Sequence, residues 1–110
     1  MAEKNIVQVK MFLKALCEKQ NLILNNDEDH VNSIAEGLME MYNSLGYYCC
    51  PCREAWGDRK NDRDIICPCD YCKPDVAEFG QCYCGLFVSE DSQGKELGSI
   101  PDRRDDALCP

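Results

Sequence analysis

Three cysteine pairs carry the chemistry that this sequence can support. Each has the form Cys-X-Cys, and the three are Cys50-Pro51-Cys52, Cys67-Pro68-Cys69 and Cys82-Tyr83-Cys84. Proline pushes the residue before it into an extended conformation, in which side chains two positions apart point the same way. Each pair can therefore present two sulfurs to one object. A disulfide within a pair would close a short and strained ring, so its partner must lie elsewhere.

Six sulfurs exceed the needs of a single metal centre. One tetrahedral zinc ion or one [4Fe-4S] cluster takes four cysteine ligands, which leaves two sulfurs over. Four ligands and one redox-active pair is the economical division of six. The spacing by itself does not assign a role to any one cysteine.

The segments around the pairs resemble the catalytic (beta) subunit of ferredoxin:thioredoxin reductase. They read YCCPCREAWGD, DIICPCDYC and GQCYCGLFV, and Ile100–Arg104 is similar to a tail segment of archaeal and bacterial members. The spacers of fourteen and twelve residues between the pairs are also similar to this archaeal and bacterial branch. Three ordered Cys-X-Cys pairs are a far more specific signal than any single one.

The resemblance implies a cofactor and a set of site residues. It implies that a [4Fe-4S] cluster is held by four cysteines, which are Cys50, Cys67, Cys69 and Cys82. The other two, Cys52 and Cys84, then form the active-site disulfide, with Cys52 as the attacking nucleophile and Cys84 as the resolving thiol. The family has a histidine where this chain has Tyr83. Tyrosine is a poor proton shuttle, and we weigh a hydrogen-bonding role against simple packing.

The activity that the resemblance implies is the reduction of protein disulfides. A ferredoxin- or rubredoxin-type donor would pass single electrons through the cluster to the disulfide, which reduces a thioredoxin-like target by thiol–disulfide exchange. Plant relatives pair with a small second subunit, which this sequence neither requires nor excludes. Two alternatives compete: a zinc-binding interaction module, although zinc modules favour Cys-X-X-Cys spacing, and a simple iron–sulfur electron carrier, which would leave two cysteines idle.

The composition predicts one small globular domain. The chain has 110 residues, of which 45% are hydrophobic and 29% charged, and chains usually divide into domains only at greater length. The net charge of −8 argues against nucleic acid as a partner. The N-terminus lacks the continuous apolar core of a signal peptide or membrane span, so we expect a cytoplasmic chain with no membrane partner.

The elements that must position the cysteines are predicted to be mainly α-helical, with irregular cysteine-rich loops (α+β at most). Residues 1–46 read as a helical scaffold packed against the loops. Its first helix shows an apolar stripe at three- and four-residue steps, formed by Val9, Phe12, Leu13, Leu16 and Cys17. Its second helix is predicted to begin at an N-cap of Asn26 or Asp27 and to end at Gly46.

The remaining chain is predicted to divide at residue 88. Residues 47–88 form the cluster and active-site loops, with a short helix from Pro74 to Gly80 and a short strand over Gly85–Val88. Residues 89–110 form an acidic tail, for which the only anchors that we identify are Leu97, Ile100 and Leu108.

Several residues outside the pairs receive structural interpretations. We expect Cys17 in the core, Cys49 as a filler, Cys72 as a passive, partly buried thiol rather than a rival ligand, and Cys109 as a free, mobile thiol. The single histidine, His30, is expected to be solvated rather than catalytic. The likeliest landing patch for an acidic donor is a group of cations formed by Arg53, Arg59, Lys60, Arg63 and Lys73.

Overall fold

The fold combines helices, one small sheet and long connecting loops, and the computed structural model describes residues 3–110. Helix α1 spans Ile6–Gln20, α2 spans Glu28–Leu45 and α3 spans Cys72–Phe79. Strands β1 (Ile23–Leu24) and β2 (Phe87–Val88) form the sheet. Short 3-10 turns occur at Arg63–Ile65, Glu90–Ser92 and Asp106–Leu108. This mainly helical architecture with cysteine-rich loops confirms the predicted fold class.

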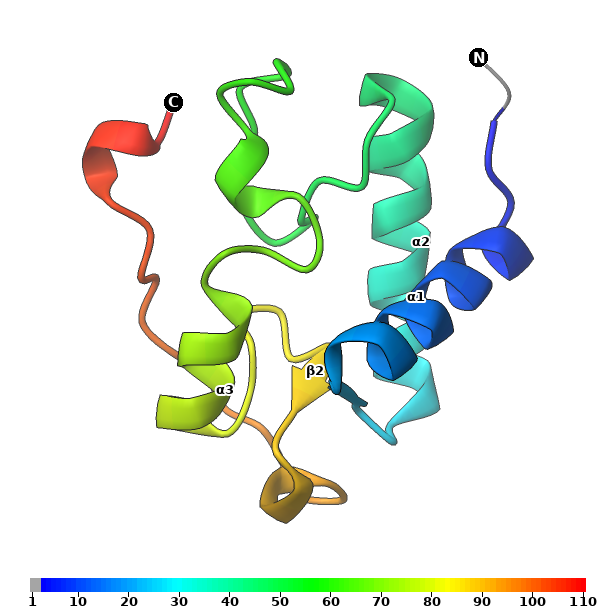
Figure 1. The fold of residues 1–110 in the computed structure, drawn as a ribbon, viewed down its shortest axis with the longest axis vertical. Helices are drawn as coiled ribbons and strands as arrows, with labels where there is room; N and C mark the ends of the chain where they lie inside the picture. The colour runs from blue at the N-terminus through cyan, green and yellow to red at the C-terminus, as the bar shows by residue number, and fades with distance from the viewer. Residues whose placement is uncertain (1–2) are drawn as a thin grey trace.

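The helices form two groups with the cysteine loops between them. Helices α1 and α2 contact each other on one side, whereas α3 lies on the other (Figure 1). The C-terminal segment passes along the side of α3 that faces away from α1 (Figure 1). Within residues 3–110, no helix is long and apolar enough to cross a membrane.

Both N-terminal helices begin and end where local chemistry favours it. Asn5 caps α1 in a capping box with Gln8, which satisfies otherwise unpaired backbone donors. Asp27 caps α2 by accepting from the amide of His30, and Gly46 ends it at a φ of 87°. The predicted cap and stop of the second helix are therefore confirmed.

The core of the helical scaffold is an apolar seam between α1 and α2. Val9 and Leu13 of α1 are buried with Ala35 and Leu38 of α2, and all belong to one cluster of contacting side chains. Burial of such side chains is the main favourable contribution to folding. The predicted stripe thus faces the core, although Cys17 lies at its partly buried edge.

The small sheet joins the scaffold to the third cysteine pair. Ile23 pairs with Val88 and Leu24 with Phe87 in an antiparallel register. The sequence did not predict β1, because two residues are too few to show an alternating pattern. The strand predicted from Gly85 begins only at Phe87, because Gly85 adopts a φ of 72° in the preceding turn.

The C-terminal tail is anchored by charge as well as by apolar contact. Arg104 is 5% exposed, and its guanidinium contacts the carboxylate of Asp64 at 2.8 Å. The expectation that only apolar residues could anchor the tail is therefore wrong. The reason is that an arginine can be buried once a distant segment supplies a carboxylate and carbonyl acceptors.

Candidate functional site

The first two cysteine pairs are held side by side by backbone pairing. Cys49 and Ile66 form an isolated antiparallel bridge. The amide of Cys50 donates to the carbonyl of Ile65 at 2.9 Å, and that of Cys67 donates to Tyr48 at 2.7 Å. Two loops that are distant in sequence thus bring their cysteines to one place.

The third pair lies in a tight turn that leads into β2. The amide of Cys82 donates to Phe87 at 2.9 Å, and the amide of Gly85 donates back to Cys82 at 2.9 Å. The amide of Phe87 also lies 3.3 Å from the Cys82 sulfur. This turn fixes the direction of both sulfurs, which lie 3.8 Å apart in Cys82 and Cys84.

The loops enclose a small internal space, here called the inner cavity. The four cysteines predicted as cluster ligands line it together with Pro68, Cys72, Tyr83, Cys84 and Phe87. The structure therefore brings Cys50, Cys67, Cys69 and Cys82 around one space, as the resemblance implies. Among the described residues, no three potential ligands converge on the position of a single metal ion. The cysteines instead line the walls, an arrangement that suits a cluster in which each iron has its own cysteine.

A second, open space, here called the outer cavity, has a volume of about 730 Å³. Cys52 is exposed and lines it, together with His30 and residues 94–99. Cys84 and Tyr83 line both cavities and therefore separate the internal cysteines from the open side. The two cysteines predicted to form the disulfide differ in position, because Cys52 faces outward while Cys84 lies between the cavities.

The two thiols also differ in acidity. Hydrogen bonds from the thiols of Cys50 and Cys84 hold the pKa of Cys52 well below its usual range. The pKa of Cys84 is raised, because hydrogen bonds within the group and burial favour its neutral form. A thiolate is the nucleophilic form of cysteine, so Cys52 is the thiol better suited to attack.

Comparison with known families agrees with this geometry. The family model described as ferredoxin thioredoxin reductase catalytic beta chain matches residues 1–102. The chain belongs to this family. No curated protein matches the chain. The family comprises iron–sulfur oxidoreductases that act on disulfides, and its name links it to ferredoxin and thioredoxin.

One residue that the sequence analysis placed in solvent contacts the turn of the third cysteine pair. His30 is partly buried, and its Nε2 lies 2.7 Å from the carbonyl oxygen of Cys84. Asn25 donates from its side chain to Gly85 and from its amide to Leu86, at 2.9 and 2.8 Å. The segment between β1 and the first turn of α2 thus contacts three successive carbonyls of the turn. The expectation of a solvated His30 is wrong, because no spacing in the sequence links residue 30 to residue 84.

Arg53 also differs from the prediction. The sequence analysis placed it in an exposed cationic patch, but Arg53 is only 7% exposed. Its guanidinium pairs with the carboxylate of Asp102 and lies over the rings of Tyr83 and Tyr71, at 4.3 and 5.0 Å from their centroids. Tyr83, the residue that departs from the family histidine, therefore packs against Arg53. The other four cations of the patch are exposed.

The cysteines outside the three Cys-X-Cys pairs have different surroundings. Cys72 is 2% exposed and lines the inner cavity, as Cys82 does. Cys72 is thus fully buried beside the site cysteines, whereas we expected a partly buried thiol. Cys49 is fully buried in the smaller core cluster, as expected of a filler. Cys109 is a free, partly buried thiol whose sulfur lies 3.7 Å from the carbonyl of Asp105.

Proposed function

We propose that this chain is an iron–sulfur disulfide reductase that takes electrons singly and delivers them in pairs to a protein disulfide. The observation that carries the proposal is the position of Cys84, which lines both the inner and the outer cavity. A disulfide between Cys84 and Cys52 would have one sulfur beside the internal cysteines and the other facing an external target. This arrangement suits a pair that connects electron entry to disulfide exchange.

The proposed cluster ligands are Cys50, Cys67, Cys69 and Cys82. Their thiols supply the four-sulfur donor set that a [4Fe-4S] cluster requires, and all four cysteines line the inner cavity. When bound there, such a cluster supplies one-electron chemistry beside a disulfide that needs two electrons. Donor set and surroundings fit this group.

Cys52 and Cys84 divide the work of exchange in this proposal. The Cys52 thiolate attacks one sulfur of the target disulfide, forms a mixed disulfide and expels the other target sulfur as a thiolate. The Cys84 thiol then loses its proton, and the resulting thiolate attacks the sulfur of Cys52. This releases the second target thiolate and leaves a Cys52–Cys84 disulfide. Two electrons, delivered one at a time by the donor, reduce that disulfide again.

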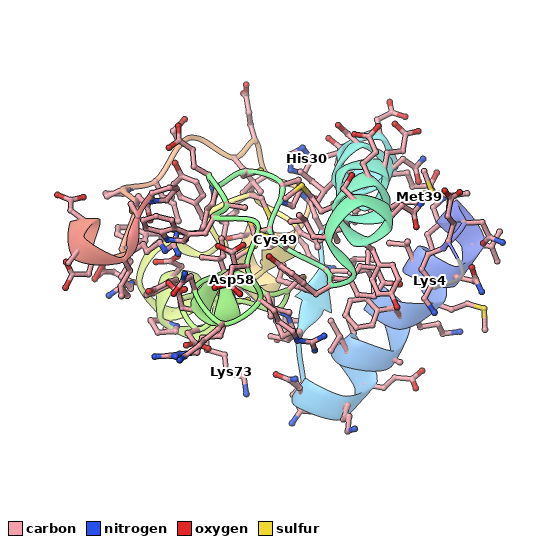
Figure 2. The ribbon with its side chains drawn as sticks, turned by 90° about the horizontal axis from the view of Figure 1, so that it is seen from above. Lys4, His30, Met39, Cys49, Asp58 and Lys73 are labelled. Atoms are coloured by element: carbon pink, nitrogen blue, oxygen red, sulfur yellow. The ribbon has the colours of Figure 1, made fainter. Side chains whose placement is uncertain are left out.

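The proposed partners approach from different sides. An iron–sulfur donor of the ferredoxin or rubredoxin type is expected at the exposed cations Arg59, Lys60, Arg63 and Lys73. A thioredoxin-like target is expected at the outer cavity, beside Cys52 and His30. Figure 2 shows His30 and Lys73 at opposite sides of the molecule, so the two partners need not compete. A small second subunit would add contacts on the donor or target side.

The decisive experiment is covalent trapping of a thioredoxin-like target. Cys84→Ser should hold the target as a mixed disulfide with Cys52, because no thiol remains to resolve it. Cys52→Ser should trap nothing. Both variants should remain brown when purified without oxygen and contain about four irons per chain. A colourless chain with zinc would favour the interaction module, and a brown chain that never traps a target would favour a simple electron carrier.

A further inference from the structure

Arg53 is a buried cation in the loop region that has no role in the proposed mechanism. Its side chain is 1% exposed, and it follows the attacking cysteine directly in the sequence. Burying an arginine is costly unless its charge and its N–H groups are compensated. A buried guanidinium beside a redox site therefore needs a physical explanation.

The contacts of Arg53 compensate it only in part. One nitrogen pairs with Asp102, whereas Nη2 is 4.0 Å from Asp75, which itself accepts from Arg103 at 2.8 Å. Nε and Nη2 of Arg53 have no hydrogen-bond partner among residues 3–110. Two faces of aromatic rings, those of Tyr83 and Tyr71, supply the remaining contact.

These contacts place the cation next to a residue that lines the inner cavity. Tyr83 contacts Arg53 through its ring and also lines that cavity. In a region of low dielectric constant, a charge at this position interacts more strongly than it would in water.

We propose that Arg53 is a positioning residue that tunes the redox centre: its guanidinium, held between Tyr83 and Tyr71, favours the more negatively charged state of a cluster in the inner cavity. The proposal rests on the proposed function. Each electron from the iron–sulfur donor adds one negative charge to this site, and a fixed nearby cation stabilises that charge. Arg53 therefore raises the reduction potential and makes the first electron easier to accept.

The same contacts assign Tyr83 a role that requires no proton transfer. Its ring contacts the guanidinium, which lies 4.3 Å from the ring centroid, and helps to hold it in position. Tyr83→Phe keeps this ring and should leave the potential unchanged. Tyr83→Ala removes the ring and should lower the potential, since Arg53 then loses a face that holds its charge beside the inner cavity.

The test is a redox titration of the purified, cluster-containing chain, followed by paramagnetic resonance. Arg53→Met removes the charge and should lower the midpoint potential, whereas Arg53→Lys should restore a value close to that of the wild type. Asp102→Asn keeps a side-chain acceptor but removes the anion that pairs with Arg53, so it should raise the potential. A purely structural role for the pair predicts that Arg53→Met and Asp102→Asn shift the potential in the same direction.

Several outcomes would overturn the inference. These are an unchanged potential in Arg53→Met, a shift that Arg53→Lys does not reverse, or a fall in Asp102→Asn. If Arg53→Met fails to assemble its cluster, the opposite shifts expected in Asp102→Asn and Tyr83→Ala still decide the question. Failure of the proposed function is a separate result, because it would appear as a lack of target trapping in Cys84→Ser, whatever the potentials are.

Discussion

The two halves of this molecule are stabilised in different ways. The helical half, residues 3–46, is held by an apolar seam in which Leu13, Ala35 and Leu38 are almost completely buried. The loop half, residues 47–110, has short elements, contributes Leu86 and Phe87 to the same apolar cluster and has a smaller cluster of its own. It also contains buried charges, among them Asp62, which accepts from the amides of Trp56 and Gly57 and from Tyr47.

This difference indicates how a small chain can position a reactive site. Apolar contacts are non-directional and give the helical half its stability without fixing fine geometry. Buried ion pairs are directional, and each depends on its partner, so they hold irregular loops in one arrangement at the risk of large losses when one member is removed. The cysteine pairs lie in the half that depends on such partners.

The largest effect is expected from Arg104→Met, which leaves Asp64 as an uncompensated, largely buried charge. Breaking a buried pair on one side typically costs about 3–5 kcal/mol. Denaturant unfolding can follow each half separately, because the single tryptophan, Trp56, reports on the loop half and circular dichroism on the helices. Arg63→Met is the matched control, since Arg63 is an exposed cation of the same loop half. Equal losses in the two variants would contradict the proposed role of the buried pair.

The next effect is expected from Leu38→Ala in the helical half. Leu38 is completely buried, and truncation of such a side chain costs about 2–5 kcal/mol through lost burial and a residual cavity. Circular dichroism should show the loss. The exposed Met11→Ala serves as the control and should change stability little. A small loss in Leu38→Ala would show that the helical half is not the apolar support described here.

A smaller effect is expected from acid, and only in the loop half. Burial by itself would raise the pKa of Asp64, but hydrogen bonds from Arg104 and Tyr71 outweigh it and hold this pKa below its usual range. The charged carboxylate therefore stabilises the fold above its unfolded pKa of about 3.9, and this contribution is lost as pH falls through the lower folded value. Thermal unfolding of the wild type, monitored by Trp56, should weaken below about pH 4.

The control for this prediction is Asp64→Asn, which cannot titrate. It should be less stable than the wild type at neutral pH and should lose less additional stability in acid. Parallel curves for the two proteins would show that Asp64 does not contribute to the acid sensitivity of the loop half.

The smallest effect is expected where the halves meet, at His30. His30→Ala removes the donor to the carbonyl of Cys84, and a hydrogen bond of this kind contributes about 0.5–1.5 kcal/mol. If His30 positions Cys84, the mixed disulfide with a target should also persist longer than in the wild type, because resolution is slowed. His30→Gln keeps a donor and should recover part of both properties. Unchanged lifetimes in both variants would limit His30 to a structural contact.

The sequence by itself determined the features that depend on neighbouring residues. The period of apolar side chains predicted α1 and α2, Asp27 and Gly46 predicted the ends of α2, and the repeated Cys-X-Cys spacing predicted which loops carry the chemistry. Family resemblance, now supported by the match over residues 1–102, added the expected roles of the six cysteines. Those individual roles stay predictions until trapping and iron content are measured.

Tertiary structure alone decided which distant residues complete the site. His30 meets the carbonyl of Cys84 from 54 positions away, and Arg53 meets Asp102 across 49. No local pattern encodes such pairs, because a polar side chain is stable in the interior only when another segment delivers its partner. Periodicity and spacing predict structure within a single helix, strand or loop. Which charged side chains are buried depends on how these elements pack together.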